Sequence, residues 1–362
     1  MIPRDLHPGA WWIWALGLAT AASATTNPVI IGLIVLAAVV VVLERRTEAP
    51  WALSFRLYVY LAVVIVAIRV VFRVAFGGAA DDLVLLELPE IPLPDVAAGI
   101  ELFGPVTRSD LLGGLYDGLR LAAMVLCVGA ANTLANPKRL LKSLPPALYE
   151  AGTAIVVALS VFPQLAESVV RVHRARTLRG DPGRGAHGLR RVVVPVMEDA
   201  LERSMLLAAT MDARGYGRSG SASPGRRRAT GALLLGGLVG LCVGTYAVLD
   251  RTAPRWLMAP FLLGGLVLAV AGLASAGRRV ERVVYRPDRW RAGEAVAVLS
   301  GVGAAALVFT LPSDVTYPVF DRVPTITVAA VVAIVIAALP AVLTPPPDLD
   351  PALGSTGEVV PP

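Results

Sequence analysis

The sequence is poor in charged residues, cysteine, histidine and lysine. Only 17% of its 362 residues are charged, whereas 56% are hydrophobic and the mean hydropathy is +0.67. A soluble domain carries about 25% charged residues, so this chain has too few charges to cover a water-facing surface. This shortage argues against a soluble enzyme, a disordered protein and a DNA-binding domain. Long apolar runs, such as 29–43 and 61–76, predict instead an all-α, polytopic membrane helix bundle.

The scarcity of reactive side chains limits the chemistry of the chain. Cys127 and Cys242 both lie in apolar segments and offer neither a disulfide framework nor metal-ligand spacing. The three histidines are far apart, and no His-Glu-x-x-His pair occurs. Neither of the two lysines follows a glycine, so the chain has no phosphate-binding loop of the Gly-x-x-x-x-Gly-Lys type. We therefore expect no metal site, no bound cofactor and no ATPase activity of its own.

Membrane-spanning segments follow from the apolar runs, since a spanning helix needs roughly 20 mostly apolar residues. About eight spans are predicted, at 11–26, 28–43, 55–76, 111–134, 230–249, 256–276, 293–311 and 324–343. We expect four of them to form an N-terminal transmembrane bundle (1–135) and four to form a C-terminal transmembrane region (229–343). The proline-rich tail, 344–362, is predicted to be disordered.

Charged loops predict the orientation, because cytoplasmic loops of membrane proteins collect arginine and lysine. The segment 77–110 holds seven acids against one base and is predicted to be an irregular extracytoplasmic loop. Thirteen arginines against five acids in 171–228, and six against two in 277–292, place both segments in the cytoplasm. Both termini are then cytoplasmic. The net charge of +6 follows from this rule and does not indicate nucleic acid.

The segment 147–170 is apolar but is not predicted to span. Basic clusters flank it on both sides, and Pro163 and Glu167 interrupt it. We expect it to lie along the membrane or under the bundle. Residues 136–228 are then one cytoplasmic insertion of amphipathic coupling helices, with helices predicted over 137–144, 147–178 and 194–214.

Two of these helices end with the same pattern, an arginine followed by glycine. The second ends in Arg176-Thr177-Leu178-Arg179-Gly180 and the third in Ala213-Arg214-Gly215. Glycine after a basic last turn is a helix-end signal, because it tolerates the left-handed conformation. The arginine complements the helix dipole and can bind a carboxylate on another protein. The repetition predicts two projecting ends that fit two similar sockets on a pair of soluble proteins.

Arg69 and Arg73 lie one helical turn apart within the third span and share a face. Such arginines either contact a partner subunit or extend to the lipid headgroups. An alternative function is a stand-alone secondary transporter, for which Asp117 and Arg120 are weak candidates for coupling residues. An intramembrane enzyme is disfavoured by the missing acid clusters and histidines.

The sequence resembles the transmembrane T component of energy-coupling factor (ECF) transporters, the family that includes the CbiQ-type subunits of cobalt importers. The resemblance covers roughly residues 6–250 and lies in His7-Pro8, Asn27-Pro28, Phe162-Pro163-Gln164-Leu165 through Arg179-Gly180, and above all Met211-Asp212-Ala213-Arg214-Gly215-Tyr216. It implies a scaffold in a bacterial cell membrane that couples two ABC ATPase subunits to a small membrane S component. The S component captures a vitamin or a transition-metal ion such as cobalt, and the ATPases use the ATP.

The resemblance also assigns roles to single residues. Arg179 and Arg214 would dock into the two ATPases, with Gly180 and Gly215 ending the helices. Two departures from the family stand out. Leu178 replaces the usual alanine, which leaves open whether Arg176 or Arg179 makes the main contact. The spans 293–311 and 324–343 extend past the usual family length and have no assigned role.

Overall fold

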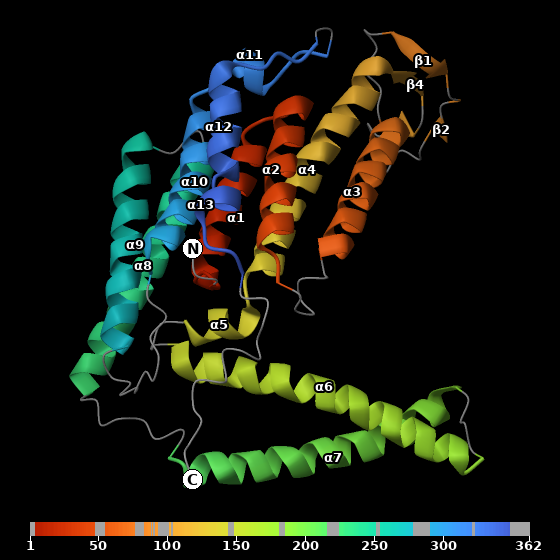
Figure 1. Ribbon diagram of the computed structural model, residues 1–362, viewed down its shortest axis with the longest axis vertical. Coiled ribbons are helices and arrows are strands. Elements are labelled where there is room, and N and C mark those ends of the chain that lie inside the picture. Colours follow the sequence, from red (N-terminus) through yellow and green to blue (C-terminus); the bar gives the residue numbers. More distant parts are fainter. Residues whose placement is uncertain are drawn as a thin grey trace. The chain divides into compact units, whose positions relative to one another are not determined.

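The computed structural model describes residues 4–47, 55–76, 83–87, 89, 91–92, 101–102, 104–143, 148–180, 185–215, 224–250, 254–277, 290–320 and 323–347 (Figure 1). They form two compact units, one from residues 1–140 with 288–362 and one from residues 141–287. Each unit is built almost entirely of helices, which confirms the predicted all-α membrane fold.

The first unit contains α1 (Pro8–Ser23), α2 (Pro28–Arg45), α3 (Phe55–Phe76), α4 (Arg108–Leu134), α5 (Pro137–Lys142), α10 (Ala292–Phe309), α11 (Ser313–Thr316), α12 (Val328–Ala338) and α13 (Pro340–Leu343). The second contains α6 (Tyr149–Leu178), α7 (Gly185–Ala213), α8 (Pro224–Leu249), a 3-10 turn η4 (Arg255–Leu257) and α9 (Met258–Gly277). The two last predicted spans therefore belong to the unit of the first four, although residues 141–287 of the chain lie between them.

Among the described residues, seven helices are long and apolar enough to cross a membrane. Six of them coincide with predicted spans, and the seventh is 151–178 in α6, which was predicted from its flanking charges not to span. The two other predicted spans correspond to shorter helices. The first, α1, has 16 residues, and the last is divided between α12 and α13 at Pro340.

Two parts of the predicted secondary structure were wrong. The loop 77–110 contains short antiparallel strands, in which β1 (Val84–Glu87) pairs with β4 (Pro105–Thr107) and β2 (Ile91–Pro92) with β3 (Glu101–Leu102). The prediction gave more weight to the acids and prolines of this segment than to its short runs of leucine and β-branched residues, which favour strands. Helix α7 begins nine residues earlier than predicted, because the helix continues through Pro195.

The first two helices begin at side chains that cap them. The ring of His7 accepts a hydrogen bond from the Gly9 N–H (3.1 Å), and the Asn27 side chain accepts one from the Val29 N–H (3.0 Å). Each cap is followed by proline at the first helical position, where a missing N–H costs nothing. This explains why His7-Pro8 and Asn27-Pro28 stand out in the sequence.

Helix α10 packs against α1 through small residues. A Cβ added at Gly17 would lie 2.5 Å from the carbonyl of Gly301, so the two backbones touch at this point. Buried alanines of α10 and α12 continue the contact, and the buried indole of Trp14 donates a hydrogen bond to the Ala337 carbonyl (3.0 Å). Of the last two spans, α10 thus packs on α1 and α12 packs on α10 and α2, and both form part of the core of this unit.

Polar contacts fix both ends of this packing. At one end the buried Asn27 amide donates to the carbonyls of Val315 (2.9 Å) and Thr325 (3.0 Å). At the other, the buried carboxylate of Glu294 pairs with Arg4 and accepts the His7 N–H. The predicted tail starts at Thr344, but residues 344–347 are packed, since the Pro346 carbonyl accepts the Arg4 N–H. Residues 348–362 of this tail lie outside the described residues.

Helix α8 packs against α9 along a row of glycines in the second unit. A Cβ added at Gly240 would lie 2.8 Å from the Cα of Gly265, and one at Gly244 would lie 2.7 Å from the Leu262 amide. Small residues at four-residue spacing let membrane helices approach this closely. The outer faces of both helices carry exposed leucine and valine, as expected for side chains that contact lipid.

Candidate functional site

The end of α6 is defined by its backbone. Arg179 is the residue that caps the helix, and its N–H bonds to the Arg176 carbonyl (3.0 Å). Gly180 follows with φ +76° and donates its N–H to the Thr177 carbonyl (3.1 Å). This left-handed conformation favours glycine, which satisfies helix-end carbonyls while the chain turns away.

The end of α7 repeats the same arrangement. The Arg214 N–H bonds to the Met211 carbonyl (3.1 Å), and Gly215, again with φ +76°, bonds to the Asp212 carbonyl (2.9 Å). The two ends therefore share one hydrogen-bond register. In that register Arg179 is the counterpart of Arg214, whereas Arg176 is the counterpart of Met211.

Both arginine side chains are exposed. Among the described residues, neither Arg179 nor Arg214 has an ion pair or a side-chain hydrogen bond. The C-terminal end of a helix carries roughly half a negative charge, which favours a guanidinium there. Arg176, by contrast, is half-buried in the last turn of α6 and has interactions of its own. Arg179 and Arg214 are thus the arginines of these two ends that are available to a partner carboxylate.

Helices α6 and α7 cross at a polar contact (Figure 1). The carboxylate of Asp199 on α7 accepts a hydrogen bond from the buried Ser168 hydroxyl on α6 (2.7 Å) and pairs with Arg171 (3.2 Å). Arg203, one turn along α7, holds its other oxygen at 3.1 Å. The Ser168 hydrogen bond, followed by Arg203 and Arg171, lowers the pKa of Asp199 below its usual value. Sequence reasoning missed this contact, because nothing local pairs Ser168 with a residue 31 positions away.

The two arginine ends lie on opposite sides of this crossing (Figure 1). Only residues 181–184 separate the last described residue of α6 from the first of α7, so α7 starts near the end of α6. With 29 residues, α7 then carries its own end roughly 43 Å away along its axis. This separation suits two separate sockets and is too large for one.

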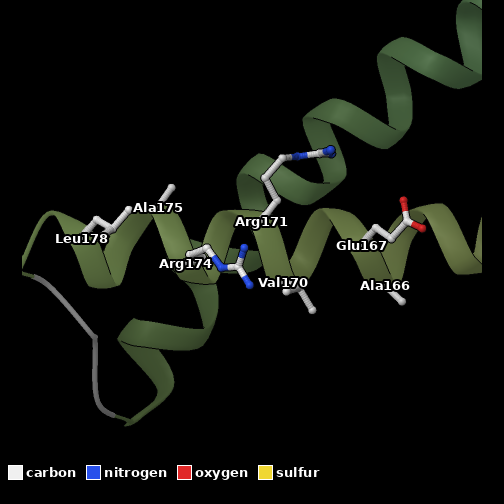
Figure 2. Close-up of a pocket in the computed structure, with 7 residues that line it drawn as sticks. All are labelled: Ala166, Glu167, Val170, Arg171, Arg174, Ala175 and Leu178. Atoms are coloured by element: carbon white, nitrogen blue, oxygen red, sulfur yellow. The ribbon is translucent and has the colours of Figure 1, made fainter.

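A groove of about 600 Å³ runs along the last turns of α6 (Figure 2). It combines apolar side chains, such as Val170 and Leu178, with Arg174 and Glu167. The groove ends at Leu178, directly before Arg179. This groove had no specific signal in the sequence beyond the spacing of apolar residues on one helix face.

The two arginines of α3 are placed by glycines of α4. A Cβ added at Gly114 would lie 2.9 Å from the Cβ of Arg73, and one at Gly118 would lie 3.3 Å from that of Arg69. Both arginines are exposed. They lie near the end of α3 that leads into the loop 77–110, away from the ends of α6 and α7 in the sequence. The two groups of arginines belong to different units.

The candidate coupling residues of a secondary transporter have separate environments. The guanidinium of Arg120 donates a hydrogen bond to the carbonyl of Ser23, the last residue of α1. This contact caps a helix end and gives Arg120 a structural role. Asp117 is half-buried on α4 and has no ion pair among the described residues. In the part of the chain that the structure describes, no group of three His, Cys, Asp or Glu side chains could hold a metal ion.

Comparison with known proteins identifies the family. Residues 1–223 match the sequence model of CbiQ, the cobalt transport protein family. The match covers α1 to α7 and ends before α8 begins. The comparison with curated proteins gives no match. Because the matched region is more than half of the chain and contains both glycine-ended helices, the chain belongs to the CbiQ cobalt transport protein family and is a multi-pass membrane component of a transporter.

Proposed function

We propose that this chain is the scaffold and coupling subunit of an ECF-type ABC importer for a transition-metal ion such as cobalt, or for a vitamin. Members of the family work with ATPase subunits and a substrate-binding S component. The observation that carries the proposal is the pair of helix ends with identical backbone geometry, each presenting an exposed arginine before a left-handed glycine.

The proposed mechanism is mechanical. Arg179 and Arg214 each insert into a groove of one of two ABC ATPases and pair with a carboxylate there. ATP binding closes the ATPases and moves the two ends relative to each other. Because Asp199 joins α6 and α7 at their crossing, a movement of the two ends moves both helices as one pair. The pair passes this motion to the S component, which then releases its solute inside the cell.

Partners and placement follow from the same proposal. The chain binds no cofactor, and ATP is used by the partner subunits. In a bacterial cell membrane, both termini and residues 136–228 face the cytoplasm, and the loop 77–110 faces outward. The exposed face of α3, with Arg69 and Arg73, is the proposed lateral contact for a membrane subunit or lipid headgroups. The surrounding bilayer is the solvent for the remaining apolar faces.

The proposal is tested with Arg179→Ala, Arg214→Ala and the double variant. A charge-assisted contact that loses one partner in a buried socket costs on the order of 3–5 kcal/mol. Uptake should therefore be abolished in each, while the chain still inserts in the membrane. Arg190→Ala, which removes an exposed arginine from the same helix α7, serves as the control and should transport normally.

Two measurements test the proposal with these variants. Co-purification should yield two ATPase copies with the unmodified chain and fewer with each variant. Uptake of radioactive cobalt or of a vitamin, measured in cells that express the complete transporter, reports the coupling. Normal uptake by the double variant would refute the docking role. Uptake by this chain alone, in vesicles without ATP, would support a secondary transporter instead.

A further inference from the structure

The chain passes between the two units at two places. It leaves the first unit after Leu140, within α5, and returns to it at Asp288, shortly before α10 begins. The second unit carries α6 and α7, so in the proposed mechanism a movement of these helices must be accommodated at these two connections. The contacts that hold the first unit at each connection therefore decide how the movement is transmitted.

The N-terminal segment, residues 4–7, holds the first connection. Arg139 lies on α5, one residue before the connection, and its guanidinium pairs with the Asp5 carboxylate (3.5 Å). The same guanidinium donates hydrogen bonds to the Asp5 backbone carbonyl (3.4 Å). The Arg139 N–H bonds to the side-chain oxygen of Asn136 (3.3 Å). Both the side chain and the backbone of Arg139 are thus held directly before the chain leaves the unit.

The same segment holds the second connection. The buried carboxylate of Glu294, in the first turn of α10, pairs with Arg4. It also accepts the N–H groups of His7 (3.2 Å) and Arg291 (3.0 Å). The ring of His7 packs against that of Trp290, with the ring centroids 5.3 Å apart. The first described residues after the connection are therefore attached to the N-terminal segment.

The N-terminal segment is itself fixed in the first unit. Leu6 is buried in the core, the Arg4 N–H bonds to the Pro346 carbonyl (3.0 Å), and His7 caps α1. Four residues span at most about 14 Å, so the contacts that hold the two connections start from one small region. Two points that are held close together restrain translation but allow rotation about the line that joins them. This is the arrangement of a hinge, which in proteins consists of a few residues in loops or at the ends of elements.

We infer that the N-terminal segment anchors a hinge between the two units, with Asp5, Arg139 and Glu294 as positioning residues for transport. The inference rests on the proposed function. When both connections are held, force from the ATPases on α6 and α7 turns the second unit about the anchor. When one connection is released, the same force displaces that connection, and ATP is hydrolysed without transmitting the full movement.

The anchor also gives a role to part of the chain beyond the family match. Asp5 and Arg139 lie within residues 1–223, whereas Trp290, Glu294 and Pro346 lie outside this range. The second connection also lies beyond residue 223. The extension thus returns the chain to the first unit, and α10 supplies the contacts that hold this return in place.

The test uses Asp5 and Arg139, because their ion pair is partly exposed and its loss should leave the fold intact. Asp5→Arg and Arg139→Asp each place like charges side by side, and the double variant restores the pair with its charges exchanged. The complete transporter is reconstituted in proteoliposomes, where uptake of radioactive cobalt is measured together with ATP hydrolysis. Hydrogen exchange over residues 137–142 reports on the anchor whatever the transported solute is.

An exposed ion pair changes a local equilibrium by up to about fivefold. Each single variant should therefore import about threefold less cobalt per ATP hydrolysed and exchange faster over 137–142, with a nearly unchanged unfolding temperature. The double variant should recover both readouts, which the loss of a merely structural contact would not predict. Arg139→Gln, which removes the pair without repulsion, should have a smaller effect in the same direction. Arg46→Asp, the matched control, reverses an exposed arginine of the same unit and should change neither readout.

The outcomes distinguish this inference from the function on which it rests. If the single variants couple uptake to ATP hydrolysis as the unmodified transporter does, or if the double variant recovers neither readout, the hinge anchor is overturned and the proposed function stands. Absence of ATP-dependent cobalt uptake by the unmodified transporter would instead contradict the proposed function for cobalt. The exchange over residues 137–142 then still decides whether the N-terminal segment holds the first connection.

Discussion

The left-handed glycines at the helix ends allow a test that leaves every charge in place. Gly180 has φ +76°, and a Cβ added there would meet no atom within 4 Å. Gly180→Ala therefore introduces no clash, and its cost is purely conformational, about 1–2 kcal/mol for an L-residue in this region. Such a cost lowers the ratio of the native helix end to its alternative conformations by about 5- to 30-fold. If docking requires that end, ATPase affinity should fall by up to the same factor.

The assay is titration of the ATPase subunits onto the chain in nanodiscs, with hydrogen exchange at residues 176–180 as a local readout. Gly180→Asn should recover much of the loss, because asparagine tolerates the left-handed region. Gly231→Ala is the matched control, since an added Cβ there also meets nothing and the site lies within helix α8. Equal affinity for Gly180→Ala and Gly231→Ala would refute the reasoning, and Gly215→Ala should repeat the Gly180 result.

Three other substitutions test the packing of the two units. Asn27→Ala removes four hydrogen bonds of a buried side chain and should destabilise the first unit by about 3 kcal/mol. The measurement is the unfolding temperature in detergent, which should fall. The control is Thr20→Ala, at an exposed position, which should have little effect. Glu294→Gln leaves Arg4 without its carboxylate and should cost about 2–3 kcal/mol in the same assay, less than a fully buried pair because Arg4 is part-exposed. The pKa of Asp199 is lowered in the folded chain, so the stability that its carboxylate contributes is present above about pH 4 and is lost as the pH falls through the folded pKa. The α6–α7 contact, measured by hydrogen exchange, should therefore loosen on acidification. Asp199→Asn should remove this pH dependence.

Local features were predictable from the sequence because they depend on neighbouring residues. The span predicted at 55–76 is helix α3 with the same bounds, and both predicted arginine-glycine ends coincide with helix ends. Hydropathy over one window defines a span, and one glycine defines a helix end. The helix predicted over 147–178 includes Pro163, and α6 does continue through it, but the first nine residues of α7 were not predicted, because Pro195 was taken to lie at the start of that helix. Proline costs one hydrogen bond, and the surrounding helix-forming residues outweigh that cost here.

Contacts between residues far apart in the chain could not be predicted from the sequence. Nothing near Arg4 indicates that its partner is Glu294, 290 positions later. The close approach of Gly17 to Gly301 depends on two glycines, each of which alone would indicate only a less stable position in an apolar helix. The register of the two helix ends likewise required the backbone. The sequence left Arg176 and Arg179 as alternatives, and the shared hydrogen bonds place Arg179 at the position of Arg214.

Helices α10 to α13 lie outside the family match but pack against helices that lie within it. Residues 1–223 match the family, yet α1 and α2 within them bury Trp14 and Asn27 against α10 to α13, outside the match. Without these helices the buried Asn27 amide and Trp14 indole would lose their acceptors in a medium that offers none. The extension must therefore fold together with α1 and α2. It leaves the arginine-glycine ends of α6 and α7 within residues 1–223, which match the family.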